Sequence, residues 1–270
     1  MPTRSTDLGN EDLEVTMSDD GTVVWATIDR PDVHNALSES VLTGLSEIAA
    51  ATRERDIRVV VIRGADGTFC SGGDLQGMDE AEPKSMFERR AGSSGLADLL
   101  EELIDADALT VAAVEGYCLA GGCGLAAGCD FVLAAEDADF GTPEVNVGMF
   151  PMQAMSAIMP AVGEKKGLKL MFTGEHIDAE TAERIGLVTD VLDADAFEDE
   201  LEAYVDSLAK NSPVMISMGK EAYYTQRDMT VEQSYSYLKE MLVLLMESED
   251  HEEGVAAFVE DREPEWGTRP

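Results

Sequence analysis

Residues 109–136, LTVAAVEGYCLAGGCGLAAGCDFVLAAE, decide the fold class of this chain. Two short apolar runs, 109–116 and 130–136, have the composition of buried strands. Between them lies a segment of glycine and alanine in which a helix can begin. Strand, turn, helix and strand in this order indicate an α/β core. A helix that begins there would present free backbone N–H groups, which stabilise a developing negative charge.

The same alternation extends on both sides of this stretch. Strand-like runs occupy 22–29 and 58–64, and helical periodicity covers 38–54, with Ser38 as its N-cap, and 86–106. After Phe150 one helical pattern follows another. We expect residues 1–10 to be flexible, 11–205 to form the α/β core, and 206–270 to form a C-terminal α-helical region.

A second glycine cluster, GTFCSGGDL at 67–75, follows the strand-like run 58–64. Glycines after a buried strand either form a turn or let a ligand approach the bare backbone. If the N–H groups of Gly73 and Gly121 point at one spot, they form a two-donor oxyanion hole for a carbonyl that becomes an enolate. The alternative is that these glycines only form turns.

Other glycine, cysteine and histidine sites are poorly supported. Gly122, Gly124 and Gly128 approach the dinucleotide pattern G-x-G-x-x-G, but the last spacing is one residue too long, and CSGG does not fit the nucleophile elbow G-x-S-x-G. The four cysteines contain no C-x-x-C pair and are expected to be buried, inert thiols. No zinc site is expected, because the three histidines, His34, His176 and His251, have no partner at ligand spacing.

The charge balance restricts the partners of the chain. It has 19 Lys and Arg against 55 Asp and Glu, a formal net charge of −36. Nucleic acid and anionic membranes are therefore disfavoured as partners, since both require a basic surface. No apolar run is close in length to the about 18 residues that a membrane span requires. The opening MPTRSTDLGN lacks the apolar core of a secretory signal. We expect a cytoplasmic, salt-adapted protein.

A third stretch, ADFGTPEVNVGMFPMQAMSAIMP at 138–160, brings these features together. With IDRPDVHNALSES at 28–40, the two glycine clusters, FTGEHIDAETAERIGLVTDVL at 172–192 and EEGVAAFVEDREPEW at 252–266, all in this order, the chain resembles the crotonase family of enoyl-CoA hydratases and isomerases. The resemblance implies a spiral of ββα repeats with a C-terminal α-helical region, and assembly into a homotrimer or a dimer of trimers.

The resemblance also implies a set of site residues. Gly73 and Gly121 correspond to the oxyanion donors, and Glu144 corresponds to a catalytic acid–base group; the other reading of Glu144 is a surface or capping acid. The substrate is an acyl-CoA thioester, and coenzyme A enters only as part of it, so no separate cofactor is expected. The residues expected to contact the substrate are Asp74, Leu75, Gln76, Val33, Ala36 and Gly124.

One position departs from the family pattern in a way that affects the reaction. Family hydratases hold a water between two glutamates, and the first of these positions is Gly124 here. A single carboxylate can still move a proton between two carbons, as in family isomerases. Hydration would need another carboxylate, for which Asp79 and Glu80 are candidates. A glutamate introduced at position 124 is expected to point toward the thioester.

Further departures concern the binding of coenzyme A and of the acyl chain. A basic residue common in the family is Gln76 here, and two tail positions are Asp261 and Glu263. The family's G-x-G-G reads MQAM at 152–155. A stripe of methionines near it is interpreted either as core or as a pliable acyl pocket: Met149, Met152, Met155 and Met159. The cations that remain as candidates for the CoA phosphates are Lys84, Arg89, Arg90 and Arg262.

The sequence therefore predicts an enoyl-CoA hydratase or isomerase. Two alternatives stay open, namely another crotonase reaction, such as acyl-CoA decarboxylation or thioester hydrolysis, and a catalytically silent protein that binds CoA esters. An RNA-binding relative is disfavoured by the net charge.

The acidic composition generates a first prediction. Repulsion among the excess carboxylates should weaken the fold at low ionic strength, whereas salt near 1 M shortens the Debye length to about 3 Å and removes most of that repulsion. The melting temperature should therefore rise steeply from low to molar KCl. A melting temperature that stays flat over this range would show that the chain is not salt-adapted.

Overall fold

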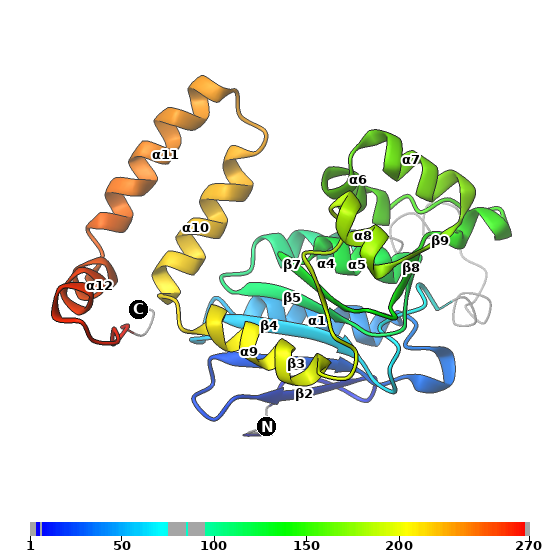
Figure 1. Cartoon of the computed structure of the whole chain (residues 1–270), viewed down its shortest axis with the longest axis horizontal. Helices are drawn as coiled ribbons and strands as arrows, with labels where there is room; N and C mark the ends of the chain where they lie inside the picture. The colour runs from blue at the N-terminus through cyan, green and yellow to red at the C-terminus, as the bar shows by residue number, and fades with distance from the viewer. Residues whose placement is uncertain (1–3, 6, 75–84, 86–94, 268–270) are drawn as a thin grey trace.

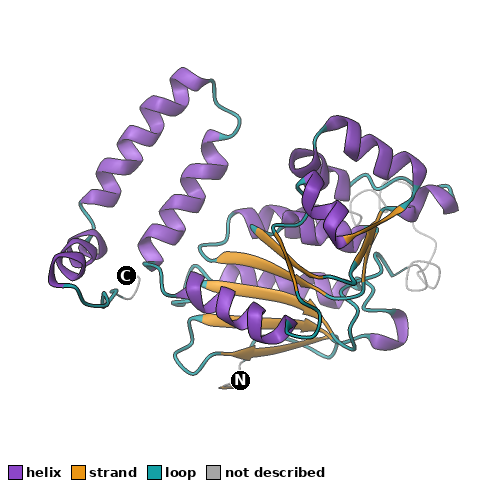
Figure 2. Cartoon of the chain, viewed as in Figure 1, coloured by secondary structure: helices purple, strands orange, loops and turns teal. Residues whose placement is uncertain are grey.

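The computed structural model describes residues 4–5, 7–74, 85 and 95–267 and has a large, mostly parallel sheet at its centre (Figures 1 and 2). Its seven strands stand in the order β1-β2-β3-β4-β5-β7-β10. The pairs from β3 to β10 are parallel, whereas β1-β2 and β2-β3 are antiparallel. The strands are β1 (Arg4–Ser5), β2 (Leu13–Met17), β3 (Val23–Ile28), β4 (Val59–Gly64), β5 (Leu109–Val114), β7 (Phe131–Ala135) and β10 (Asp190–Leu192).

A second sheet holds the strands that alternate with these along the chain: β6 (Tyr117–Leu119), β8 (Asp139–Gly141) and β9 (His176–Asp178). Successive units thus give one strand to each sheet, as β5 and β6 do before helix α5 (Gly121–Gly128). Isolated bridges Cys70–Cys118 and Leu37–Gly73 continue the second sheet back to the earlier units. This repetition is the spiral of ββα units that the sequence predicted.

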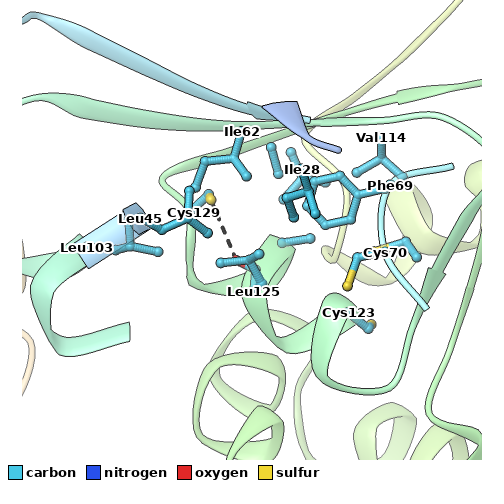
Figure 3. Packing of buried hydrophobic residues seen from close by; sticks show 14 of the residues in the cluster. Ile28, Leu45, Ile62, Phe69, Cys70, Leu103, Val114, Cys123, Leu125 and Cys129 are labelled. Carbon is cyan, nitrogen blue, oxygen red and sulfur yellow. Dashed lines mark hydrogen bonds between the residues drawn. The ribbon is translucent and has the colours of Figure 1, made fainter. Parts of the chain in front are cut away.

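Helices cover both faces of the large sheet because alternate strand residues are buried on opposite sides. Val24, Ala26 and Ile28 of β3 pack with helices on one face, and Figure 3 shows Ile28 and Phe69 in this core. Val23 and Trp25 pack against α9 (Phe197–Ala209) on the other face. The helices of the first core are α1 (Glu39–Ala51), α4 (Gly95–Ile104), α5, α6 (Ala154–Val162), α7 (Glu164–Thr173) and α8 (Ala179–Ile185).

Most local predictions are confirmed. The four central strand runs form β3, β4, β5 and β7, and Ser38 caps α1 by accepting a hydrogen bond from Val41 N at 3.1 Å. All four cysteines are buried as free thiols. Residues 86–94 of the predicted helix 86–106 lie outside the described residues. The boundary expected at 205/206 falls inside α9, which packs on the sheet.

The chain ends in three helices that extend away from the sheet: α10 (Pro213–Gln226), α11 (Val231–Met246) and α12 (Glu249–Glu260) (Figure 1). Lys220 attaches α10 to the core. Its buried Nζ donates to Leu103 O at 2.7 Å, Ala108 O at 2.9 Å and Asp130 Oδ2 at 2.8 Å. Tyr224 donates to the other oxygen of Asp130 at 2.9 Å. Within the described ranges, no helix has both the length and the apolar composition to cross a membrane.

Replacing Lys220 by Met should destabilise the protein strongly. The substitution leaves the buried carboxylate of Asp130 without its cation, and breaking a buried pair in this way costs about 3–5 kcal/mol. Urea unfolding in molar KCl would measure the loss. Lys169→Met is the control, because its ion pair with Glu175 is exposed and such pairs contribute about 1 kcal/mol or less. Equal losses for both variants would contradict the assigned role of Lys220.

Candidate active site

Two segments that are far apart in the sequence, 34–37 and 71–74, pair at the end of the second sheet. Ser71 N donates to His34 O at 3.0 Å, Leu37 N to Gly72 O at 2.7 Å and Asp74 N to Leu37 O at 3.1 Å. The N–H of Gly73 lies between these bonds, and no acceptor for it exists among the described residues. Gly73 is also exposed. Its N–H is therefore a free donor held in a fixed backbone.

A second free donor stands at the start of α5. Ala120 joins β6 to this helix with φ 51° and ψ −124°, a conformation that costs about 1–3 kcal/mol for a residue with a Cβ. Ala120 N donates to Gly141 O at 2.8 Å, and Ala120 O accepts from Gly124 N at 3.2 Å. Gly121 is the first residue of the helix, so its N–H has no partner within the helix, and the described residues provide no other acceptor for it.

The two donors lie side by side. A Cβ built on Gly121 would lie 3.6 Å from Gly73 N, and one built on Gly72 would lie 3.4 Å from Gly121 N. Gly72 itself must be glycine, because its φ is +111° and a Cβ there would lie 2.6 Å from Ala120 Cβ. Two neighbouring, unpaired N–H groups can bind one oxygen that gains negative charge.

Cys70, next to this site, packs rather than reacts. A Cβ on Gly122 would lie 2.6 Å from Cys70 O and 2.8 Å from its Sγ, so the start of α5 rests directly on this residue. Burial raises the pKa of the Cys70 thiol to about 12. The thiol therefore stays protonated at neutral pH and is not a nucleophile.

Glu144 lies in the short 3-10 helix η2 (Pro143–Val147), which begins two residues after β8 ends at Gly141. Since Gly141 O accepts the hydrogen bond from Ala120 N, the loop that carries Glu144 starts beside the N-terminus of α5. Glu144 Oε2 is buried, and the described part of the chain offers it no hydrogen-bond partner. Burial raises the pKa of this carboxyl. Such a group is suited to accept and return a proton, and a buried oxygen does not fit a surface acid.

A model of the enoyl-CoA hydratase/isomerase family matches residues 18–269, nearly the whole chain. The chain belongs to the enoyl-CoA hydratase/isomerase family. It is 33% identical over 254 residues to a probable enoyl-CoA hydratase of Rhizobium meliloti, covering 92% of this chain and 96% of that protein. It is 31% identical over 258 residues to the 2,3-dehydroadipyl-CoA hydratase of Escherichia coli, covering 95% and 99%.

Solved structures of enoyl-CoA hydratase/isomerase relatives have the same fold. An enoyl-CoA hydratase of Mycobacterium smegmatis superimposes with a TM-score of 0.88 at 32% identity, covering 95% of this chain and 99% of that one. Human enoyl-CoA hydratase domain-containing protein 3 gives a TM-score of 0.88 at 27% identity, covering 95% and 100%. The predicted crotonase fold and family are confirmed.

The structure brings several of the predicted binding residues together. Val33 and Ala36 precede the paired residue Leu37, and the carboxylate of Asp74 contacts Arg30 at 2.8 Å. Arg30 is a residue that the sequence analysis missed, although DRP in the family's entry segment was a signal. The candidates Leu75, Gln76, Asp79, Glu80, Lys84, Arg89 and Arg90 lie outside the described residues.

The structure leaves no room for a side chain at position 124. Gly124 is buried, and a Cβ there would lie 2.5 Å from Ala154 Cβ and 2.6 Å from Ala154 Cα. Helix α6 therefore occupies the space that a glutamate at 124 would enter. The sequence signal for this contact was MQAM in place of G-x-G-G, since Ala154 is one of these residues.

The interpretation of the methionine stripe needs one revision. Met149 and Met152 are 49% and 68% exposed, so the core interpretation is wrong for them; both precede the first turn of α6. Met155 and Met159 are partly buried against the core. Arg262, a candidate for the CoA phosphates, already pairs with Glu253 at 2.6 Å and Glu260 at 2.7 Å.

Glu144→Gln should stabilise the folded protein at neutral pH. Folding raises the pKa of the Glu144 carboxyl above its ordinary value of 4.5, which means that the folded protein favours the protonated carboxyl. The resulting stabilisation is fully present below pH 4.5 and is lost as the pH rises through the raised pKa. At neutral pH the buried carboxylate is therefore unfavourable, and glutamine removes it. The melting temperature of the variant should exceed that of the native protein at pH 7, and the difference should shrink as the pH falls.

Glu101→Gln is the matched control, because it removes the same charge from an exposed position of α4. An increase in melting temperature that is equal for both variants would show that only the net charge matters.

Proposed function

We propose that the protein is an acyl-CoA isomerase that moves a double bond along the acyl chain. The substrate oxygen would accept hydrogen bonds from Gly73 N and Gly121 N. Glu144 would take a proton from C2 of a 3-enoyl thioester, the electrons would shift through the enolate to form the C2–C3 double bond, and the proton would return at C4. The observation that carries the proposal is the pair of adjacent N–H donors near Glu144, whose Oε2 is buried and has no partner among the described residues.

Hydration is the second candidate, favoured by the names of the relatives. It needs a water held for attack at C3, in addition to the proton transfer by Glu144. Position 124, where the crotonase resemblance places the first hydratase glutamate, has no side chain here and is closed by Ala154. This contact favours migration over hydration.

Parallel assays would test the function. The native protein should convert 3-hexenoyl-CoA to 2-hexenoyl-CoA faster than it hydrates crotonyl-CoA. Glu144→Gln should still bind both esters but should lose about 100-fold or more in turnover, as expected for removal of a general acid–base group. Hydrolysis or decarboxylation across a panel of CoA esters would instead support the other crotonase reactions. Binding without any turnover would indicate a silent binding protein.

The Gly124–Ala154 contact yields a more specific prediction. Gly124→Glu alone should fold poorly, because its Cβ meets the backbone of Ala154. Gly124→Glu combined with Ala154→Gly removes the atom in closest contact and supplies a second carboxylate. The Cα of residue 154, at 2.6 Å from the new Cβ, still requires the start of α6 to shift. The double variant should hydrate crotonyl-CoA at least about 10-fold faster than the native protein, since a positioned acid–base group contributes about 10²–10⁴-fold. Ala154→Gly is its control. Fast hydration by the native protein would contradict the one-carboxylate mechanism.

We also propose that the chain forms trimers through its C-terminal helices. Helices α10 to α12 extend away from the core (Figure 1) and expose large apolar side chains, among them Tyr235, Leu242, Leu244, Met246, Phe258 and Val259, of which Phe258 is 88% exposed. Apolar surface of this extent is typical of a protein interface. Sedimentation in molar KCl should give the mass of three chains or a multiple of it, and a single-chain mass would refute the proposal.

A further inference from the structure

Arg30 is connected to the Gly73 donor through two peptide groups. Its side chain is only 17% exposed, and Nη1 donates to Ala36 O at 2.6 Å. Ala36 C=O and Leu37 N–H belong to one peptide group, and Leu37 N donates to Gly72 O at 2.7 Å. Gly72 C=O and Gly73 N–H in turn belong to the next peptide group of the series. The hydrogen bonds therefore run in one direction from the guanidinium to the free N–H of Gly73.

The same guanidinium also holds the other side of the donor. Arg30 Nη2 donates to Asp74 Oδ2 at 2.8 Å, and Asp74 N donates to Leu37 O at 3.1 Å. Arg30 thus contacts the residue that precedes Leu37 and the residue that follows Gly73. A planar fork with several N–H donors suits this bridging position, and a lysine would not reproduce it.

The loop that carries Arg30 is itself fixed. Arg30 N donates to Asn35 Oδ1 at 2.9 Å, and Asn35 N donates back to Arg30 O at 2.9 Å. Asn35 is fully buried, and its Nδ2 donates to Ala65 O at 2.9 Å and Thr68 O at 2.6 Å. On its outer side, Arg30 Nε faces Asp12 Oδ1 at 3.4 Å.

We propose that Arg30 is a positioning residue that orients and strengthens the Gly73 donor of the oxyanion hole, a role that rests on the proposed function. Hydrogen bonds in a chain polarise one another, by about 10–30% per bond. A positive charge at the donor end of this chain makes each following N–H a better donor, and the last of them is Gly73 N–H. The rigid bonding of Leu37 to Gly72 also fixes the direction of that N–H, on which its interaction with an oxyanion depends.

The test combines kinetics with the spectrum of a bound ligand. Arg30→Met removes the charge and the donors, whereas Arg30→Gln removes the charge and keeps a polar side chain with an N–H donor. Both variants should lose about 10- to 100-fold in kcat on 3-hexenoyl-CoA, which is no more than the loss expected when a whole oxyanion donor is removed. The KM should change by about threefold or less, because the substrate is still bound. Crotonyl-CoA labelled with ¹³C at its carbonyl, bound to each variant in a Glu144→Gln background, should show a smaller downward shift of the carbonyl stretch than in Glu144→Gln alone.

Arg58→Met is the matched control. Arg58 is as buried as Arg30, with Nη1 on Ala209 O at 3.2 Å and Nη2 on Asp56 Oδ2 at 3.2 Å, but it lies at the opposite end of β4 from the glycine cluster. Its replacement should lower the melting temperature and leave kcat and the carbonyl frequency unchanged.

The outcomes separate the two proposals. If crotonyl-CoA bound to the Glu144→Gln protein has the carbonyl frequency that it has in water, the oxyanion hole and the proposed function fail together. If that frequency is shifted, and a folded Arg30→Gln variant shows the same shift and the native kcat, only the role of Arg30 is overturned. Arg30→Gln decides the question even if Arg30→Met does not fold.

Discussion

The hydrogen bond from Leu37 N to Gly72 O is the interaction on which the site depends most directly. It joins the segment after β3 to the segment after β4, and it fixes the peptide group that contains the Gly73 N–H. The next unit of the spiral is placed against this peptide by the contact between Gly72 and Ala120, where the absence of a Cβ lets the start of α5 approach. The two donors are neighbours because these backbones meet without side chains between them.

Around this backbone, two basic residues make internal contacts. Lys220 pairs with Asp130 and attaches α10 to the core, while Arg30 bridges Ala36 and Asp74 beside the candidate oxyanion site. In a protein with 19 basic and 55 acidic residues, each cation has many possible acidic partners in the chain. The partner of each buried cation is selected by burial and geometry rather than by the number of carboxylates in the chain. Salt screens a buried ion pair less than an exposed one, so the buried pair keeps more of its attraction.

The contact between Gly124 and Ala154 links two departures from the crotonase pattern that looked independent in the sequence. Position 124 has no side chain here, and the Cβ of Ala154 fills the volume that such a side chain would occupy. Close packing explains the match, since a core tolerates neither an empty volume nor an extra side chain without a cost in stability. The acid–base groups available to the reaction are therefore set by a pair of residues, which leaves Glu144, whose Oε2 is buried without a partner among the described residues, as the candidate acid–base group.

The sequence by itself determined the strands, the cap of α1 at Ser38, the two glycine clusters and the order of the family's segments. These depend on neighbours in the chain, through alternation of apolar residues, local capping bonds and the freedom of glycine. Only the tertiary structure decided that a side chain at 124 would meet Ala154, that Met149 and Met152 are exposed, and that Arg30 bonds to Ala36 and Asp74. These facts depend on which distant segments come into contact in the fold. The spiral brings together residues that are far apart in the sequence, and no local sequence pattern indicates which of them will meet.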